Sequence, residues 1–173
     1  MNRAALAGWQ VLGDSDAKAT MQRMAKAVRA ALGNESLTQT ARGIVAQLAP
    51  RNVISQARTL RAWADQHFRF VNDPLGVELI ESPIYHLDEI KRRGFVQGDC
   101  DDAATLCAAL GLSIGIAATF VAYAFNTPTA PYSHVVCSLW PLGIPNPPRI
   151  ECDITRPKGM QPPKVTRHLM VRV

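Results

Sequence analysis

The sequence predicts an α+β fold in which the helices come first and an antiparallel sheet follows. Two observations lead to this class. Between Ser15 and His67, apolar residues recur three and four positions apart, which is the spacing of amphipathic helices. After Gly115, short runs rich in small and β-branched residues alternate with loops that contain proline and asparagine. With 173 residues, the chain is long enough for a core of about 120 residues and an added segment.

Residues 1–50 are predicted to form an N-terminal arm and a helical hairpin. Residues 1–13 lack a clear period, and we expect an arm that docks through Trp9 and Leu12. The residues expected to begin and end the two helices are Ser15 and Gly33 for the first, and Ser36 and Pro50 for the second. One face of each helix is apolar: Met21, Met24, Ala25, Val28 and Leu32 in the first, and Leu37, Ala41, Ile44, Val45 and Leu48 in the second. Such faces more often form a core than a binding groove.

The remaining elements are expected in the order helix, helix, helix, sheet. A helix over 52–67 leads to a turn at 70–74, and a long polar connection then leads to a short helix over 87–93. The strands are expected over 116–125, 132–140 and 149–154, with 169–173 as a further edge strand. The region 51–156 is thus the predicted core, and 157–173 is a basic tail.

Cys100 is expected at the start of the last of these three helices, which contains the apolar run 103–112. The chain reads Gln97-Gly98-Asp99-Cys100-Asp101-Asp102 and then becomes apolar over 103–112, so a loop with a glycine passes into a helix. Free backbone N–H groups and the helix dipole at such a position favour a thiolate. The same groups donate to a carbonyl oxygen that gains charge during attack. Cys100 is therefore the candidate nucleophile.

A histidine and an aspartate follow on two predicted strands. His134 lies in Ser-His-Val-Val, and Asp153 lies in Glu-Cys-Asp-Ile-Thr. In residue type, order and spacing, Cys100, His134 and Asp153 resemble the transglutaminase-like superfamily of papain-type cysteine enzymes. The resemblance covers about 53–156, so the N-terminal helical hairpin stands outside it. It implies a papain-type core made of helices followed by an antiparallel sheet.

The resemblance also implies a chemistry. Cys100 would attack an amide carbonyl, His134 would be the base and then the acid, and Asp153 would orient the imidazole. Thioester formation would serve hydrolysis or acyl transfer on a peptide or isopeptide bond, with no cofactor and no metal. The Cys100 backbone N–H would be one oxyanion donor. The candidates for the second donor are Gln97, Tyr85 and Trp63.

Three aspartates close to Cys100 complicate this reading. Carboxylates at Asp99, Asp101 and Asp102 suit a helix N-terminus but raise the pKa of a nearby thiol. We expect Asp101 or Asp102 to cap the helix or to pair with Arg92 or Arg93. Two further alternatives remain open. These are a cation site on the three aspartates and a zinc site made by Cys100, His134 and Cys152. Ile154 also departs from the family pattern, which has proline there.

The four cysteines are expected to be reduced thiols. Cys100 and Cys107 would lie two helical turns apart, about 10 Å, which is too far for a disulfide. Cys137 and Cys152 are expected to be neighbours on adjacent strands and to remain two buried thiols.

The charge pattern divides the chain into three parts. Residues 1–72 have ten Lys and Arg against four acids, residues 73–153 have four against ten, and residues 154–173 have five against none. Attraction between flanks and core explains this pattern, and so does a basic docking surface for nucleic acid or an acidic protein. Nucleic acid is the less favoured partner because aromatic residues are not interleaved with the basic ones.

A second function is a structural or assembly protein with a vestigial triad, which would dock through residues 1–50 and 157–173. Short relatives of this kind resemble those found in bacteriophage genomes, which implies a virion component. No run approaches the about 20 apolar residues of a membrane span, and no Sec signal is expected. The expected location is therefore the host cytoplasm or the virion.

Overall fold

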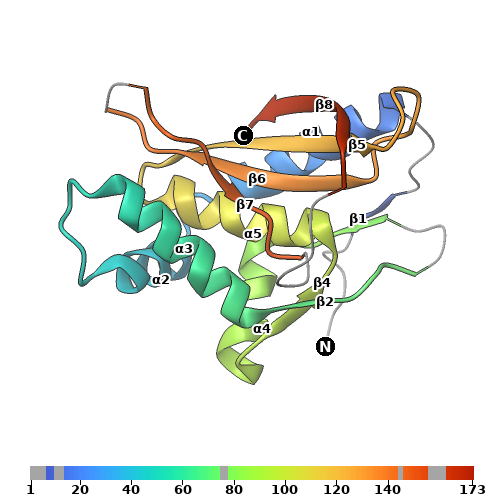
Figure 1. Cartoon of the computed structure of the whole chain (residues 1–173). Coiled ribbons are helices and arrows are strands. Elements are labelled where there is room, and N and C mark those ends of the chain that lie inside the picture. The colour runs from blue at the N-terminus through green and yellow to red at the C-terminus, as the bar shows by residue number, and fades with distance from the viewer. Residues whose placement is uncertain (1–6, 10–13, 75–77, 144–145, 156–162) are drawn as a thin grey trace.

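The computed structural model describes residues 7–9, 14–74, 78–143, 146–155 and 163–173 (Figure 1). The helices are α1 (Asp14–Ala31), α2 (Glu35–Val45), α3 (Val53–His67), α4 (Pro83–Arg93) and α5 (Cys100–Ser113). The strands are β1 (Ala7–Trp9), β2 (Phe68–Phe70), β3 (Glu78–Ile80), β4 (Val96–Gly98), β5 (Ala117–Phe125), β6 (His134–Trp140), β7 (Ile150–Cys152) and β8 (Val165–Arg172). The predicted α+β class is confirmed.

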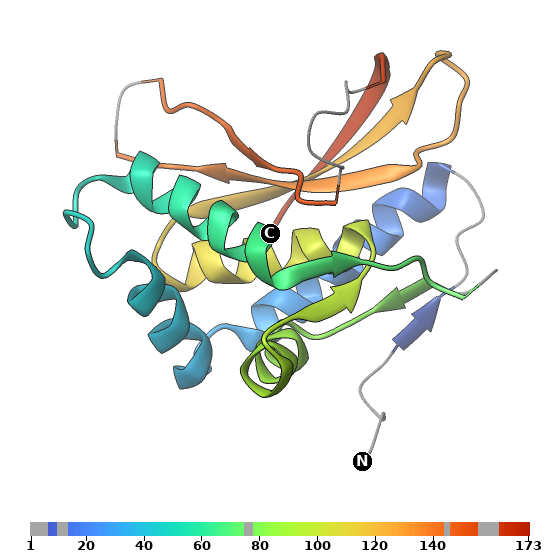
Figure 2. The same cartoon turned by 60° about the horizontal axis from the view of Figure 1, so that its bottom comes forward.

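One four-stranded antiparallel sheet, in the order β7-β6-β5-β8, forms one layer of the molecule. The helices form the other layer, and α5 lies directly against the sheet beneath β6 (Figures 1 and 2). Each of the other four helices packs on α5. The helix that begins with Cys100 is therefore the central element of the fold.

The burial of α5 follows from its sequence. Every residue from Asp101 to Gly111 is buried, and most of them are alanine, leucine or cysteine. A helix that is apolar all round has to be covered on all sides. Gly111 permits close contact with the sheet, because a Cβ at this position would lie 2.5 Å from Leu139 Cδ2. Among the described helices, none is long and apolar enough to cross a membrane.

The first two helices join the main core. Met21, Met24 and Val28 of α1, together with Leu37 and Ala41 of α2, belong to the buried cluster that contains the α5 side chains. Both helices pack chiefly on α5, so the expected hairpin is not an isolated pair. Leu32, which was expected on the buried face, lies just past the end of α1 and is 37% exposed.

The start of α2 differs from the prediction. Asn34 is the N-cap, and its side chain accepts a hydrogen bond of 3.2 Å from the Leu37 N–H. Ser36, the expected cap, lies inside the first turn, and its hydroxyl contacts the Lys91 ammonium. Asn34 follows Gly33, whose φ of 89° turns the chain between α1 and α2. The cap therefore lies two residues earlier than the serine pattern predicted.

The region between α3 and α5 contains strands that the sequence did not reveal. Asn52 caps α3, and the helix runs into β2, which pairs in parallel with β4 just before Cys100. β3 pairs antiparallel with β1, which includes Trp9, while Leu12 lies outside the described residues. α4 begins at Pro83, four residues earlier than expected, because Ser82 caps it. The pairing of β2 with β4 and the position of α4 thus fix the path of the chain just before α5.

The four strands of the main sheet agree well with the prediction. β8 forms the expected edge strand next to β5, although it begins at Val165 rather than near residue 169. Cys137 and Cys152 are register partners on β6 and β7, and all four cysteines are free thiols. Burial and the neighbouring Cys152 thiol raise the pKa of Cys137 well above its usual range. The expected pair of buried thiols is confirmed.

The helix cap gives a direct test of the fold. We expect Asn34→Ala to lower the free energy of unfolding by about 1 kcal/mol, because the first turn of α2 loses its side-chain acceptor. Ser36→Ala is the matched control and should change it by less than about 0.5 kcal/mol, since its hydroxyl contacts only an exposed lysine. Urea unfolding of both variants measures the difference. A larger loss in Ser36→Ala would contradict the assignment of the cap.

Candidate functional site

Cys100 is the first residue of α5 and is half-buried. Asp99 is the N-cap of the helix, and its carboxylate accepts a hydrogen bond of 3.1 Å from the Asp101 N–H. The thiol thus lies at the positive end of the central helix, where the sequence placed it. The cap itself was assigned to Asp101 or Asp102, and that assignment was wrong by two or three residues.

His134 and Asp153 form a pair. The His134 Nε2 lies 3.3 Å from Asp153 Oδ1, and the Asp153 side chain is only 7% exposed. His134 is the first residue of β6, and Asp153 follows the last residue of β7, so the pairing of these two strands brings them together. Thr155 also donates to Asp153 Oδ1, at 3.4 Å. Asp153 is therefore placed to orient the imidazole.

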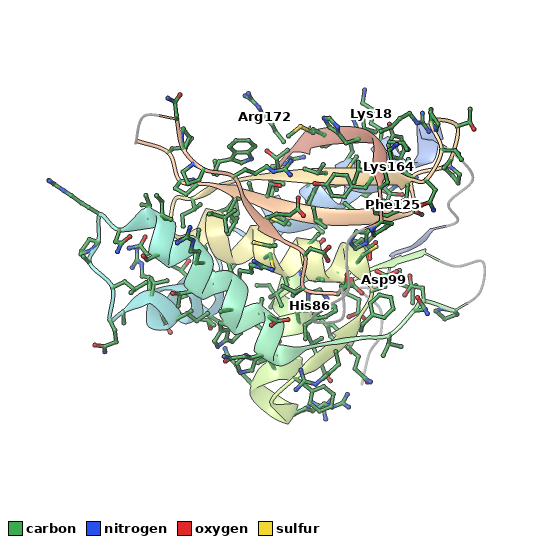
Figure 3. The ribbon with its side chains drawn as sticks, viewed as in Figure 1. Lys18, His86, Asp99, Phe125, Lys164 and Arg172 are labelled. Atoms are coloured by element: carbon green, nitrogen blue, oxygen red, sulfur yellow. The ribbon has the colours of Figure 1, made fainter. Side chains whose placement is uncertain are left out.

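Cys100 and His134 border the same cavity, which has a volume of about 180 Å³. Its walls are the first turns of α1, Asp99 and Cys100 at the start of α5, Ala122 of β5, and residues 132–135 at the start of β6. Figure 3 shows Asp99 and Phe125 at the same end of the molecule, where α5 begins and β5 ends. Of the three expected catalytic residues, two thus border one cavity and the third contacts the histidine.

The ring of His134 also has neighbours on the other face of the sheet. Val135 belongs to the main core, whereas Val136 belongs to a second cluster, as expected from strand alternation. Phe125 packs against that second cluster, and its ring centroid lies 6.2 Å from that of His134. The His134 ring therefore lies near Phe125, on the face of the sheet that does not pack on α5, and His134 also borders the cavity.

Asp102 is held by α4 and by the chain before it. Its Oδ1 accepts a hydrogen bond of 2.9 Å from the Glu81 N–H and lies 3.5 Å from His86 Nε2. The expected partners, Arg92 and Arg93, form ion pairs with Glu89 on the surface of α4 instead. That expected pairing was wrong. No motif in the sequence marked His86 as the true partner.

His86, which is labelled in Figure 3, is fully buried, and two carboxylates lie beside its ring. Its Nε2 lies 3.3 Å from Glu81 Oε2 and 3.5 Å from Asp102 Oδ1, as in an ion pair. Burial alone would lower the pKa of His86, but the carboxylates of Asp102 and Glu81 outweigh it and raise this pKa to about 9. A positive charge therefore lies just beneath the aspartates at the start of α5.

Asp73 extends this acidic cluster. Its carboxylate accepts a hydrogen bond of 2.5 Å from the Leu79 N–H. Burial raises the pKa of Asp73 to about 6, and the nearby charges of Asp99, Asp102 and Glu81 contribute to the rise. Gly98 closes the cluster from β4, because a Cβ there would lie 2.5 Å from Asp102 Oδ2. The glycine before the cysteine is thus required by the buried carboxylate.

Two groups of described residues have side chains of the types that bind metal cations. Glu81, His86 and Asp102 form one, and Asp99, Asp101 and Asp102 form the other, each with its ligand atoms within 4.8 Å. The imidazolium of His86 already supplies a positive charge to the first group. Neither group contains a cysteine, so Cys100, His134 and Cys152 do not converge as the zinc alternative requires.

The expected second oxyanion donors lie elsewhere. Gln97 is exposed on β4, Tyr85 is exposed on α4, and Trp63 stacks on His67 with ring centroids 4.4 Å apart. None of the three borders the cavity. The cavity residues that sequence reasoning did not name are those of α1, because a core was favoured over a binding groove for its apolar face.

No protein-family model, curated protein or solved structure matches this chain. The transglutaminase-like resemblance therefore stays a prediction that rests on the three motifs.

The charge on His86 makes stability depend on pH. Because its pKa is about 9 when folded and near 6.5 when unfolded, its contribution is complete below pH 6.5 and disappears as the pH rises through 9. We expect this group to cost the wild type about 2 kcal/mol of unfolding free energy between pH 6 and pH 8, a range below the pKa of about 8.5 at which cysteines of the unfolded chain titrate. Urea unfolding at each pH measures it.

Two histidine variants serve as controls for this loss. His86→Gln should remove most of the pH dependence, whereas His168→Gln, at an exposed position of β8, should leave it unchanged. An equal slope in the wild type and in His86→Gln would show that the buried ion pair is not its source.

Proposed function

We propose that this protein is a cysteine-dependent hydrolase or acyltransferase of amide bonds. The observation that carries the proposal is that Cys100 and His134 border one cavity, while Asp153 contacts the His134 Nε2 at 3.3 Å. A nucleophile, a base and a group that orients the base are the three parts that amide cleavage through a thioester needs. The resemblance to the transglutaminase-like superfamily assigns the same three residues.

In the proposed first step, the imidazole accepts the thiol proton and the Cys100 sulfur forms a bond to the carbonyl carbon. The electron pair of the C=O bond moves to oxygen. When the tetrahedral intermediate collapses, the C–N bond breaks, and the amine leaves with the proton from His134. Because Nε2 is directed at Asp153, Nδ1 is the ring nitrogen that would exchange this proton.

In the second step, water or an amine attacks the thioester carbon and transfers a proton to His134. The C–S bond breaks, and the thiolate leaves and is reprotonated. Water gives hydrolysis, and an amine gives a new amide. The Cys100 backbone N–H at the start of α5 would stabilise the oxyanion in both steps.

The rate of thiol alkylation tests this proposal. At pH 7, iodoacetamide should modify Cys100 at least roughly tenfold faster than Cys107, Cys137 or Cys152, which are buried. His134→Ala should slow Cys100 roughly tenfold, because the thiolate loses the imidazolium partner, and Asp153→Asn should slow it less. Peptide mapping by mass spectrometry gives the rate at each cysteine.

The dependence on His134 separates an activated thiol from one that is merely accessible. His168→Ala is the control, since His168 is exposed on β8 and does not border the cavity. If Cys100 reacts at the rate of free cysteine in both variants, the enzyme proposal fails. The assembly role of residues 1–50 and 157–173 would then be the better interpretation.

A further inference from the structure

The two basic flanks of the sequence meet in the structure. In the first flank, residues 17–34 contain four lysines and arginines and no acid, and all four lie on α1. In the second, residues 163–173 contain three and no acid, and two of the three lie on β8. α1 packs against β8 (Figure 1). Positive charges from opposite ends of the sequence therefore share one region of the surface.

Five of these side chains are exposed, and we call them the basic surface: Lys18, Lys26, Arg29, Lys164 and Arg172. Figure 3 shows Lys18 and Arg172 at the same edge of the molecule. None of the five forms an ion pair with an acid of the described residues, whereas Arg149 pairs with Glu151. Attraction between flanks and core, one explanation of the charge pattern, therefore does not account for the basic surface.

The basic surface is elongated. Lys18, Lys26 and Arg29 lie eight and three positions apart, so they occupy one face of α1 and span about 16 Å along it. The opposite face, which includes Met24 and Val28, belongs to the core. β8 extends for eight residues, which corresponds to about 26 Å. A surface of this shape fits an extended chain better than a small anion.

β8 adds a second feature, because it is the last strand of the main sheet. It pairs with β5 on one side, and no other described strand pairs with it. About half of its backbone N–H and C=O groups are therefore directed away from the sheet, as at other edge strands. Two apolar side chains on it are also exposed, Val165 by 44% and Met170 by 43%. An edge of this kind can bind an extended peptide as a further strand.

Protection of the edge does not explain the whole surface. Lysine and arginine on an edge strand can prevent unwanted pairing with other chains. That role would account for Lys164 and Arg172, but Lys18, Lys26 and Arg29 lie on a helix. The basic residues of α1 therefore indicate that the surface binds an anionic partner.

The combined features select among the possible partners. A second copy of this chain is disfavoured, because pairing of β8 with β8 would bring like charges together. Nucleic acid would match the charge but would not use the strand edge. No exposed phenylalanine, tyrosine or tryptophan lies on the described part of α1 or on β8 for base stacking. An acidic polypeptide in extended conformation uses the charge, the strand edge and the two apolar side chains together.

We infer that α1 and β8 form a docking surface for an acidic, extended segment of a partner protein. This segment adds to the main sheet as a strand beside β8, and its main chain forms hydrogen bonds with that strand. Its carboxylates face the basic surface, with Lys26 on α1 and Arg172 on β8 among their contacts. The inference does not depend on the proposed function, because no residue of the basic surface borders the cavity beside Cys100.

Binding of a labelled peptide tests the inference. The probe repeats Glu-Glu-Val-Thr three times and carries fluorescein, and its anisotropy is measured against protein concentration at about 0.15 M salt. We expect saturable binding, and the matched peptide with lysine in place of glutamate should bind at least roughly tenfold more weakly. Absence of binding, or tighter binding of a labelled DNA duplex than of the acidic peptide, would overturn the inference. A dimer that Arg172→Glu abolishes would assign β8 to a second copy and overturn it as well.

Charge reversal locates the surface. The double variant Lys26→Glu with Arg172→Glu should weaken binding of the acidic peptide at least roughly tenfold. Arg51→Glu with Arg58→Glu is the matched control, because both arginines are exposed near the start of α3 and make no ion pair with a described acid. It should weaken binding less than about twofold, since salt screens charges more than about 8 Å away. Equal losses in the two double variants would contradict the assigned surface.

Proline in the peptide tests the addition of a strand. Replacing each valine of the probe by proline keeps the charge but removes N–H groups that a strand needs, and it should weaken binding at least roughly tenfold. Replacement by alanine keeps those groups and should weaken binding less. A proline peptide that binds as tightly as the alanine peptide would rule out strand addition.

Two further measurements separate this inference from the proposed function. The rate of Cys100 with iodoacetamide should be unchanged in the Lys26→Glu and Arg172→Glu double variant, and Cys100→Ala should bind the acidic peptide like the wild type. A slow Cys100 with normal peptide binding would overturn the proposed function alone. A rapid Cys100 without peptide binding would overturn the docking surface alone.

Discussion

The buried carboxylate of Asp102, in the first turn of the central helix, is the constraint on which the site depends. It is only 1% exposed, and a buried charge is costly unless other groups compensate for it. The Glu81 N–H and the buried imidazole of His86 provide that compensation. Because these groups come from α4 and the segment before it, they fix where α5 begins. The position of Cys100 therefore depends on the positions of Glu81 and His86.

The other half of the site depends on the sheet. Pairing of β6 with β7 brings Asp153 to His134, and packing of β6 on α5 brings both to the helix that begins with Cys100. β8, which pairs with β5, supports the loop before His134. Arg167 donates to the Ala130 carbonyl at 2.7 Å and lies over the Tyr132 ring, so it holds the loop that leads to His134. The basic C-terminal strand thus stabilises one wall of the cavity.

Sequence alone predicted the parts of the fold that have local signals. Periodicity located α1, α3 and α5, and the β-branched runs located β5, β6 and β7. The expected caps of α1 and α5 were wrong, because Ser15 lies inside α1, which begins at Asp14, and Asp99 caps α5. The parallel pairing of β2 with β4 was missed because three-residue strands have too little pattern to stand out. Asn34 was overlooked as a cap because Ser36 offered a similar signal two residues later.

The site was predictable only where a motif exists. Cys100, His134 and Asp153 were predicted as a set because each occurs in a recognisable motif, and in the structure Cys100 and His134 border one cavity. His86 was missed because a lone histidine on a helix has no distinctive pattern, and its role arises from long-range contacts with Glu81 and Asp102. The lining residues of α1 were not named because an apolar helix face looks the same whether it covers a core or lines a cavity. Arg92 and Arg93 were assigned to the wrong acid because the nearer Glu89 lies on the same helix.

The central claim is that the Cys100 sulfur and the His134 imidazole lie close enough to exchange a proton, and chemical cross-linking tests it most directly. 1,3-Dibromoacetone links a thiol to a second nucleophile a few ångströms away, each displacing one bromide. Mass spectrometry of the digested protein should show the peptides of Cys100 and His134 joined, and His134→Ala should abolish that product. A cross-link from Cys100 to another residue, or only single addition, would show that the imidazole is directed at the far face of the sheet and would contradict the account.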